Sequence, residues 1–208
     1  MKIRIHQIIE NTKVEGPGNR TCIFVQGCLK ECYGCNSKQT WDMNVGTEYE
    51  IDKLAKKILS NKKIEGVTFS GGEPFLQSKQ LYKLAKILKK EGLSIVTFTG
   101  YDYNFIKKIN DGNWNNLLAI TDLLISGDFQ IDKKTINKIW IGSTNQEYHF
   151  LTGRYKNLEK KLKFLENKIE IHLKNDGSLI INGMGDNKKI KKIFKDIYFF
   201  LISSVEKN

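Results

Sequence analysis

The chain contains the stretch Thr21-Cys-Ile-Phe-Val-Gln-Gly-Cys28-Leu-Lys-Glu-Cys32-Tyr-Gly-Cys35-Asn36, in which an apolar run leads into a tight group of cysteines. The run at residues 21–26 is typical of a buried strand, and the residues that follow it are typical of a loop. The chain has 4 cysteines, and three of them form a C-x₃-C-x₂-C pattern in this loop. The stretch therefore predicts a strand that delivers three thiols to one site at its end.

Downstream, strand patterns alternate with amphipathic helix patterns, which predicts an α/β fold of parallel βα units. Three predicted strands end in glycine-containing loops: Ser70-Gly-Gly-Glu-Pro74, Thr99-Gly-Tyr101 and Ser126-Gly-Asp-Phe129. Because ligands bind at the carboxyl ends of parallel strands, we expect these loops and the cysteine loop to line one mouth. The expected strands are 3–9, 21–26, 67–69, 94–98, 123–125 and 139–141, and the expected helices are 50–60, 77–91 and 103–111.

The pattern changes after about residue 155, so we expect a core at 1–155 and a small C-terminal α+β extension at 156–208. A lysine-rich helix is predicted at 156–165, and a last amphipathic helix at 187–202. Between them, Ile169-Glu-Ile-His-Leu, Asn175-Asp-Gly and Ser178-Leu-Ile-Ile predict a β-hairpin.

The composition favours a globular, cytoplasmic protein. Of the 208 residues 40% are hydrophobic, and no apolar run is long enough to span a bilayer. The net charge is +11, but the lysines are scattered in short groups without interleaved aromatic residues, which does not favour nucleic-acid binding. Cysteines clustered in a chain without an export signal indicate a metal site, since secreted proteins spread theirs as disulfides.

Three thiolates from one loop can hold three irons of a 4Fe–4S cluster, which leaves the fourth iron open to a substrate. Zinc is the alternative, but it needs a fourth ligand and favours separated pairs of cysteines. Cys22 and His6 are the nearest candidates for that ligand, and Cys22 reads as a buried thiol in a strand. An open iron–sulfur cluster is the favoured interpretation.

Together, the cysteine loop and the strand-terminal Gly71-Gly72-Glu73 resemble the radical S-adenosylmethionine superfamily. The resemblance implies a partial, open βα barrel, with Cys28, Cys32 and Cys35 as cluster ligands. It also implies that the open iron chelates the methionine end of the cofactor. The cluster and the cofactor would carry the chemistry, so no side chain is expected to be catalytic.

The cofactor-binding residues follow by the same resemblance. Gly71, Gly72 and Glu73 match the element that binds the methionine group, and Gly34, Cys35 and Asn36 lie where the backbone meets the adenosyl cofactor. Gly34 could let the cofactor approach the backbone, or it could equally serve only to permit the turn. The Thr99 hydroxyl could contact the cofactor or cap its strand. Asp128, Asn145 and Gln146 could line the substrate face or pin a loop, and Arg20 could contact a partner or form a surface salt bridge.

A narrower resemblance points to the activating components of anaerobic ribonucleotide reductases. It rests on landmarks in order from about residue 15 to about residue 155, among them Gly16-Pro-Gly-Asn-Arg20 and Gly142-Ser-Thr-Asn-Gln146. It implies an activase that makes a glycyl radical on a partner such as the reductase large subunit, fed by a flavodoxin- or ferredoxin-type electron donor. Because the extension is extra, another protein, a peptide or a small molecule stays open as the substrate. A non-enzymatic iron–sulfur or zinc module is the alternative from another class.

Overall fold

The computed structural model describes residues 1–173, 176–186, 192 and 195. A mixed sheet of seven strands, in the order β3-β1-β2-β4-β5-β6-β7, forms its centre. Its middle strands, β2, β4, β5 and β6, run parallel, as the alternating pattern predicted, while β1, β3 and β7 pair antiparallel. The strands are β1 (Lys2–Thr12), β2 (Arg20–Val25), β3 (Thr47–Glu50), β4 (Gly66–Gly71), β5 (Ser94–Thr99), β6 (Leu123–Ser126) and β7 (Glu147–Phe150).

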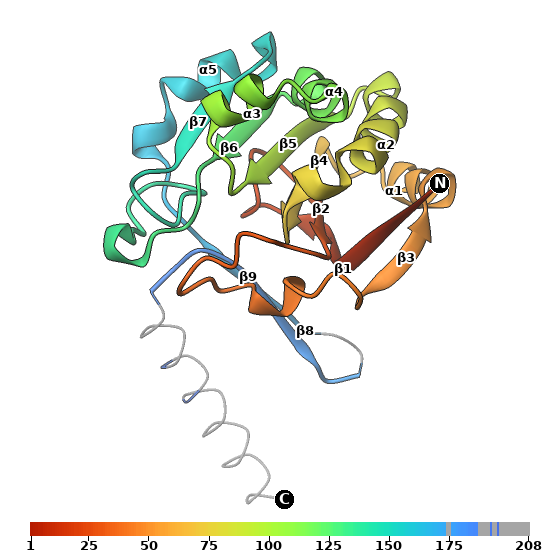
Figure 1. The fold of residues 1–208 in the computed structure, drawn as a ribbon. Coiled ribbons are helices and arrows are strands. Elements are labelled where there is room, and N and C mark those ends of the chain that lie inside the picture. Colours follow the sequence, from red (N-terminus) through yellow and green to blue (C-terminus); the bar gives the residue numbers. More distant parts are fainter. Residues whose placement is uncertain (174–175, 187–191, 193–194, 196–208) are drawn as a thin grey trace, which may run out of the picture.

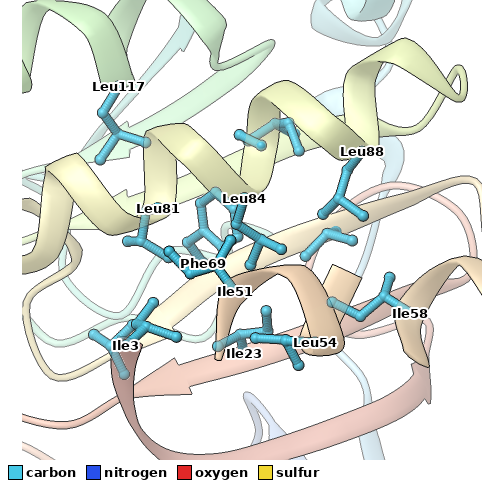
Figure 2. Close-up of a cluster of buried hydrophobic side chains, with 14 of the residues drawn as sticks. Ile3, Ile23, Ile51, Leu54, Ile58, Phe69, Leu81, Leu84, Leu88 and Leu117 are labelled. Carbon is cyan, nitrogen blue, oxygen red and sulfur yellow. The ribbon is translucent and has the colours of Figure 1, made fainter. Parts of the chain in front are cut away.

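Four helices cover one face of this sheet (Figure 1). Their apolar residues recur at helical spacing and pack onto the outward side chains of the strands. Figure 2 shows leucines of α2 above Phe69 of β4 and Ile23 of β2. All of these side chains are at most 3% exposed, so burial of this face is the main stabilising contribution. The helices are α1 (Ile51–Ser60), α2 (Ser78–Lys90), α3 (Tyr103–Ile109) and α4 (Gly112–Ile120).

Alternate residues of the strands face the other side of the sheet, where a second core forms around Val96, Leu123 and Ile125. The strand predicted at 139–141 is wrong. These residues form a turn in which Trp140 has φ 59°, and Trp140 and Ile141 bury their side chains in this second core. Asn167 holds the turn, because its side chain accepts from Trp140 N at 2.9 Å and donates to Lys138 O at 2.7 Å.

The C-terminal region differs in part from its prediction. The helix expected at 156–165 is helical only at α5 (Lys156–Glu159), and a 3-10 turn follows at Leu162–Phe164. The predicted hairpin is present as β8 (Ile169–Leu173) and β9 (Leu179–Gly183), on the side of the sheet away from α1 to α4 (Figure 1). The helix predicted at 187–202 lies outside the described residues, apart from Lys192 and Lys195. Within the described part of the chain, no helix is long and apolar enough to cross a membrane.

Candidate cluster and cofactor site

The cysteine loop begins directly after β2 and folds back on itself. Gly27 N donates to Thr40 O at 2.8 Å, and Cys28 N donates to Trp41 O at 3.0 Å. The buried side chain of Gln26 donates to Gln39 O and to Asp42 O. These bonds fix both ends of the loop and present its middle part to the carboxyl ends of the parallel strands.

All three loop cysteines line one cavity of about 140 Å³, together with the ends of β4, β5 and β6. The sequence-based expectation of a shared mouth is therefore met by the geometry. Of the predicted residues, the cavity takes in the cysteines, Gly71, Gly72, Glu73 and Thr99, whereas Gly34 and Asn36 do not line it. Asn36 instead lines a neighbouring cavity, and Gly34 takes φ 80° with Ile131 packed against it. The other residues around the cavity are Lys30, Thr40, Trp41, Ser70, Phe98, Gly100, Ile125, Gly127, Phe129 and Gln146.

The three thiols are partly exposed and receive backbone N–H groups. Burial raises the pKa of Cys28 and that of Cys32, while the N–H groups of Lys30 and Glu31 act on Cys28 in the opposite direction. Ser37 N donates to Cys35 Sγ at 3.3 Å. Such donors stabilise thiolates and tune iron–sulfur clusters, so this donor set fits a cluster.

Among the described residues, no three His, Cys, Asp or Glu side chains converge to hold one metal ion. Thiolates of a cubane bind different irons, so the cysteines of a cluster need not converge in this way. Cys22, the fourth cysteine, is 0% exposed in the middle of β2 and does not line the cavity.

Gly71 and Gly72 bring the end of β4 into direct contact with the start of the cysteine loop. A Cβ on Gly72 would lie 2.3 Å from Gly27 O, and one on Gly71, which has φ 95°, would lie 2.6 Å from the Phe24 Cα. Gly72 N donates to Val25 O at 2.9 Å, so the two backbones are joined by a hydrogen bond. Only glycine allows this approach, which gives both residues a role in placing the loop.

Glu73 is 1% exposed and joins the loop after β4 to the end of β5. Its Oε1 accepts from Phe75 N and from the Thr99 hydroxyl, both at 2.9 Å, and its Oε2 accepts from Gly100 N at 2.8 Å. Burial raises the pKa of Glu73 to about 7. A carboxylate has about four acceptor positions, so three internal donors leave room for one more donor from a ligand.

The Thr99 hydroxyl donates to Glu73 and also accepts from Tyr101 N at 3.1 Å, which leaves it one acceptor position. It therefore acts as the cap of its strand in this structure. Likewise, Asn145 donates to Asp128 O at 2.9 Å, and Gln146 donates to Gly127 O at 2.8 Å, which pins the loop after β6. Of the three polar residues predicted near this loop, Gln146 lines the cavity, whereas Asp128 and Asn145 do not.

Arg20 is buried, so it does not present its side chain to a partner, but it does form a salt bridge: its Nη1 lies 3.8 Å from Oε1 of Glu65, whose side chain is 42% exposed. Arg20 is 0% exposed, and its guanidinium donates to Thr68 Oγ1 at 2.8 Å, to Tyr155 OH at 2.8 Å and to Ser94 Oγ at 3.0 Å. It begins β2, as Ser94 begins β5, so the network closes the amino ends of the strands. The sequence could not show this, because its partners come from four separate segments.

Lys30 is a site residue that the sequence analysis missed, and it is the one cation among the described lining residues. Its Nζ lies 5.2 Å from the centroid of the Tyr101 ring, and its charge lowers the pKa of the buried Glu73 carboxyl against the effect of burial. Its position between two loop cysteines was the available signal.

Comparison with known proteins agrees with this geometry. The family described as a 4Fe-4S single cluster domain matches residues 14–149. The pyruvate formate-lyase-activating enzyme of Clostridium pasteurianum is 32% identical over 93% of this chain and 77% of its own length. The anaerobic ribonucleoside-triphosphate reductase-activating protein of Escherichia coli strain K12 is 32% identical over 70% of this chain and 97% of its own length.

A weaker structural likeness, with a TM-score of 0.42 and 23% identity, covers 48% of this chain and 53% of QueE from Escherichia coli. The family match covers well over half of the sequence, and the two activating proteins are similar across most of their own lengths. The chain therefore belongs to the 4Fe–4S single cluster domain family, among the radical S-adenosylmethionine activating enzymes whose cofactors are a 4Fe–4S cluster and S-adenosylmethionine.

Proposed function

We propose that this protein is an activase that reductively cleaves S-adenosylmethionine and leaves a radical on a glycine of a partner protein. One observation carries the proposal: three of the four cysteines meet the strand-terminal Gly71-Gly72-Glu73 at one cavity, and the fourth is buried in a strand. With three cysteine ligands, one iron of a cubane keeps an open position for the cofactor. An electron carrier would instead use four.

When bound, the cluster would deliver one electron from an external donor, and S-adenosylmethionine would supply the group that accepts a hydrogen atom from the glycine. The products would be methionine, 5′-deoxyadenosine and a glycyl radical. Within the chain, Cys28, Cys32 and Cys35 hold the cluster. Gly71 and Gly72 keep the cysteine loop against β4, and their exposed backbone offers acceptors to the cofactor's ammonium group. The carboxylate of Glu73 joins the loop after β4 to the end of β5 and has one acceptor position left for the same group.

The remaining predicted contacts are assigned more narrowly. Gly34 permits the turn before Cys35, where Ile131 packs against it, and Asn36 lines the neighbouring cavity. Thr99 acts as a positioning residue through Glu73. We interpret the sheet as an open barrel wall, with 1–155 as the core and the residues from 156 as an extension packed on it.

The partner is a glycyl-radical enzyme, and two are supported. The anaerobic ribonucleotide reductase fits the landmarks between about residue 15 and residue 155, and the reductase activator matches 70% of this chain over nearly all of its own length. A pyruvate formate-lyase fits the extension, because the activator of that enzyme matches 93% of this chain. A flavodoxin- or ferredoxin-type donor would supply the electron. We propose a cytoplasmic location, because thiols are kept reduced in that compartment.

The test is anaerobic reconstitution with iron and sulfide, reduction with dithionite, and addition of S-adenosylmethionine. We expect 5′-deoxyadenosine, and its loss in Cys28→Ala, Cys32→Ala and Cys35→Ala, whereas Cys22→Ala should retain it and serves as the matched control. Paramagnetic resonance with added reductase or pyruvate formate-lyase should then show a glycyl radical on one of them. Zinc in place of iron, together with no 5′-deoxyadenosine, would refute the proposal.

A further inference from the structure

The hairpin β8–β9 is held to the core by polar contacts with the segment after β1. Asn182 donates to the Thr12 hydroxyl at 2.8 Å, and Gly183 N donates to Glu15 Oε1 at 3.1 Å. On the other strand, Glu170 accepts from Lys13 N at 2.9 Å. Asn182 and Thr12 are at most 6% exposed, so these contacts fix where the end of β9 lies.

Residues 183–185, at the end of β9, form one wall of a cavity of about 210 Å³. Residues 134–136 also line this cavity. The cavity shares Cys35, Phe98, Phe129 and Gln146 with the cysteine-lined cavity, so the two adjoin. Anything that fills the second cavity from outside therefore reaches the side of the cluster site.

The size and the walls of this second cavity favour a short stretch of extended backbone. Its volume is below the roughly 300–1,000 Å³ of pockets that enclose drug-sized ligands. Three glycines, at positions 142, 183 and 185, line it, so part of its wall is backbone. A Cβ on Gly183 or on Gly185 would point toward Lys168 or Ile169, neither of which lines the cavity. Trp140, which is 4% exposed, lines both this cavity and a separate one of about 460 Å³, which is also lined by residues 13–14 and 16–18.

We propose that this second cavity receives the glycine-bearing segment of the partner protein, and that the hairpin, through Met184, is the wall that decides which segment fits. The inference rests on the proposed function. The occupant is a short extended protein segment, since the cavity ends beside Cys35 and has no room for a folded element. A chain without the hairpin would leave this side open, so the extension would act on partner choice and not on cleavage of S-adenosylmethionine.

The experiment fills the cavity from each wall in turn. Met184→Trp adds a ring from the hairpin, and Ile136→Trp, at a position that is 42% exposed, adds one from the lining segment 134–136. Leu173→Trp is the matched control, because Leu173 lies on the same hairpin, is 72% exposed and does not line the cavity. Pyruvate formate-lyase and the anaerobic reductase large subunit serve as probes.

Each reconstituted protein is assayed for 5′-deoxyadenosine without partner, for glycyl radical with partner, and for partner binding by anaerobic calorimetry. We expect partner-free cleavage within about twofold of the parent in all variants, and a loss of partner binding and radical yield of roughly tenfold or more in both cavity variants, in line with the cost of overpacking. Leu173→Trp should behave as the parent.

Unchanged partner binding and radical yield in both cavity variants would overturn the inference, as would equal losses in the Leu173→Trp control. Loss of partner-free cleavage in both cavity variants would show that the cavity belongs to the cofactor site, which also overturns it. If the parent cleaves S-adenosylmethionine but neither binds nor activates either probe, the proposed function fails, and this outcome is distinct from a failure of the variants alone.

Discussion

Glu15 should make the protein less stable as the pH rises, and Glu15→Gln should remove this dependence. The Glu15 carboxyl faces the hairpin, where Gly183 N donates to it, and burial together with repulsion by Glu170 raises its pKa to about 7 from 4.5. Because the pKa is higher in the folded state, protonated Glu15 contributes stability that is complete below pH 4.5 and is lost as the pH rises through about 7.

The magnitude follows from the two pKa values. The difference between 4.5 and about 7, at about 1.4 kcal/mol for each pH unit, sets a ceiling of about 3–4 kcal/mol. The residue as a whole is partly exposed, and solvent screens its charge, so we expect about 2 kcal/mol. Glu15→Gln keeps an oxygen acceptor for Gly183 N and cannot ionise. The variant should therefore be more stable than the parent by about 2 kcal/mol at pH 8 and by less than about 1 kcal/mol at pH 5.

The assay is anaerobic urea unfolding of parent and variant between pH 5 and pH 8.5. Comparing the two proteins at each pH cancels other titrating groups, such as Glu73, that both contain. Glu91→Gln makes the same chemical change at an exposed position and controls for the change in net charge. A constant difference between the parent and Glu15→Gln across this range would refute the reasoning, because it would mean that folding does not change the ionisation of Glu15.

Three further changes test other parts of the structure. Tyr155→Phe removes a hydroxyl bonded to Arg20 and Glu65, so it should lower the free energy of unfolding by about 1.5–3 kcal/mol. Tyr82→Phe is the control, because the Tyr82 hydroxyl has no partner within the described part of the chain. It should change the free energy of unfolding little in the same urea titration. Asp111→Ala removes the side chain that caps α4 through Asn113 N and Trp114 N, so it should lower the free energy of unfolding by about 1 kcal/mol. Asp111→Asn should largely restore that stability, and equal losses in the two variants would contradict a capping role. Glu73→Gln replaces one acceptor oxygen by an amide NH₂ group, which would face Gly100 N or the Thr99 hydroxyl. The free energy of unfolding should fall by about 1–3 kcal/mol, and S-adenosylmethionine should bind more weakly by calorimetry. Unchanged stability would show that the three bonds to Glu73 are unimportant.

The features that the sequence predicted are those set by local pattern. The helices α1 and α2 and the parallel strands carry clear apolar periods, and the structure has them close to the expected residues. The helix α4 was missed because Gly112-Asn-Trp-Asn-Asn begins it without a helical pattern, and the cap that starts it, Asp111, acts through two backbone bonds. The strands β3 and β7 have four residues each, which is too short for a period to be evident.

The features that the sequence did not predict depend on distant segments. The run Ile-Trp-Ile at 139–141 has strand composition, but Asn167, which is far along the chain, holds it in a turn. The bonds from Thr99 and Gly100 to Glu73 were likewise not evident from the sequence, because they join two separate loops, while the contact of Glu73 with a ligand stays a prediction. In both cases the hydrogen bonds come from distant segments.

The opposite ends of the parallel strands have different roles in this fold. At the amino ends, Arg20, Ser94 and Tyr155 form a buried network in which each polar group has a partner. At the carboxyl ends, glycines bring two loops into contact, and three thiols remain partly exposed. A half-exposed site contributes little apolar burial, so the helix-covered face and the buried network must supply the stability that the site lacks. Backbone bonds from the end of β4 tie the cysteine loop to this stable part: Gly72 N donates to Val25 O at 2.9 Å, and Glu73 N donates to Gly27 O at 2.8 Å. They explain how an open cysteine loop can keep a fixed position.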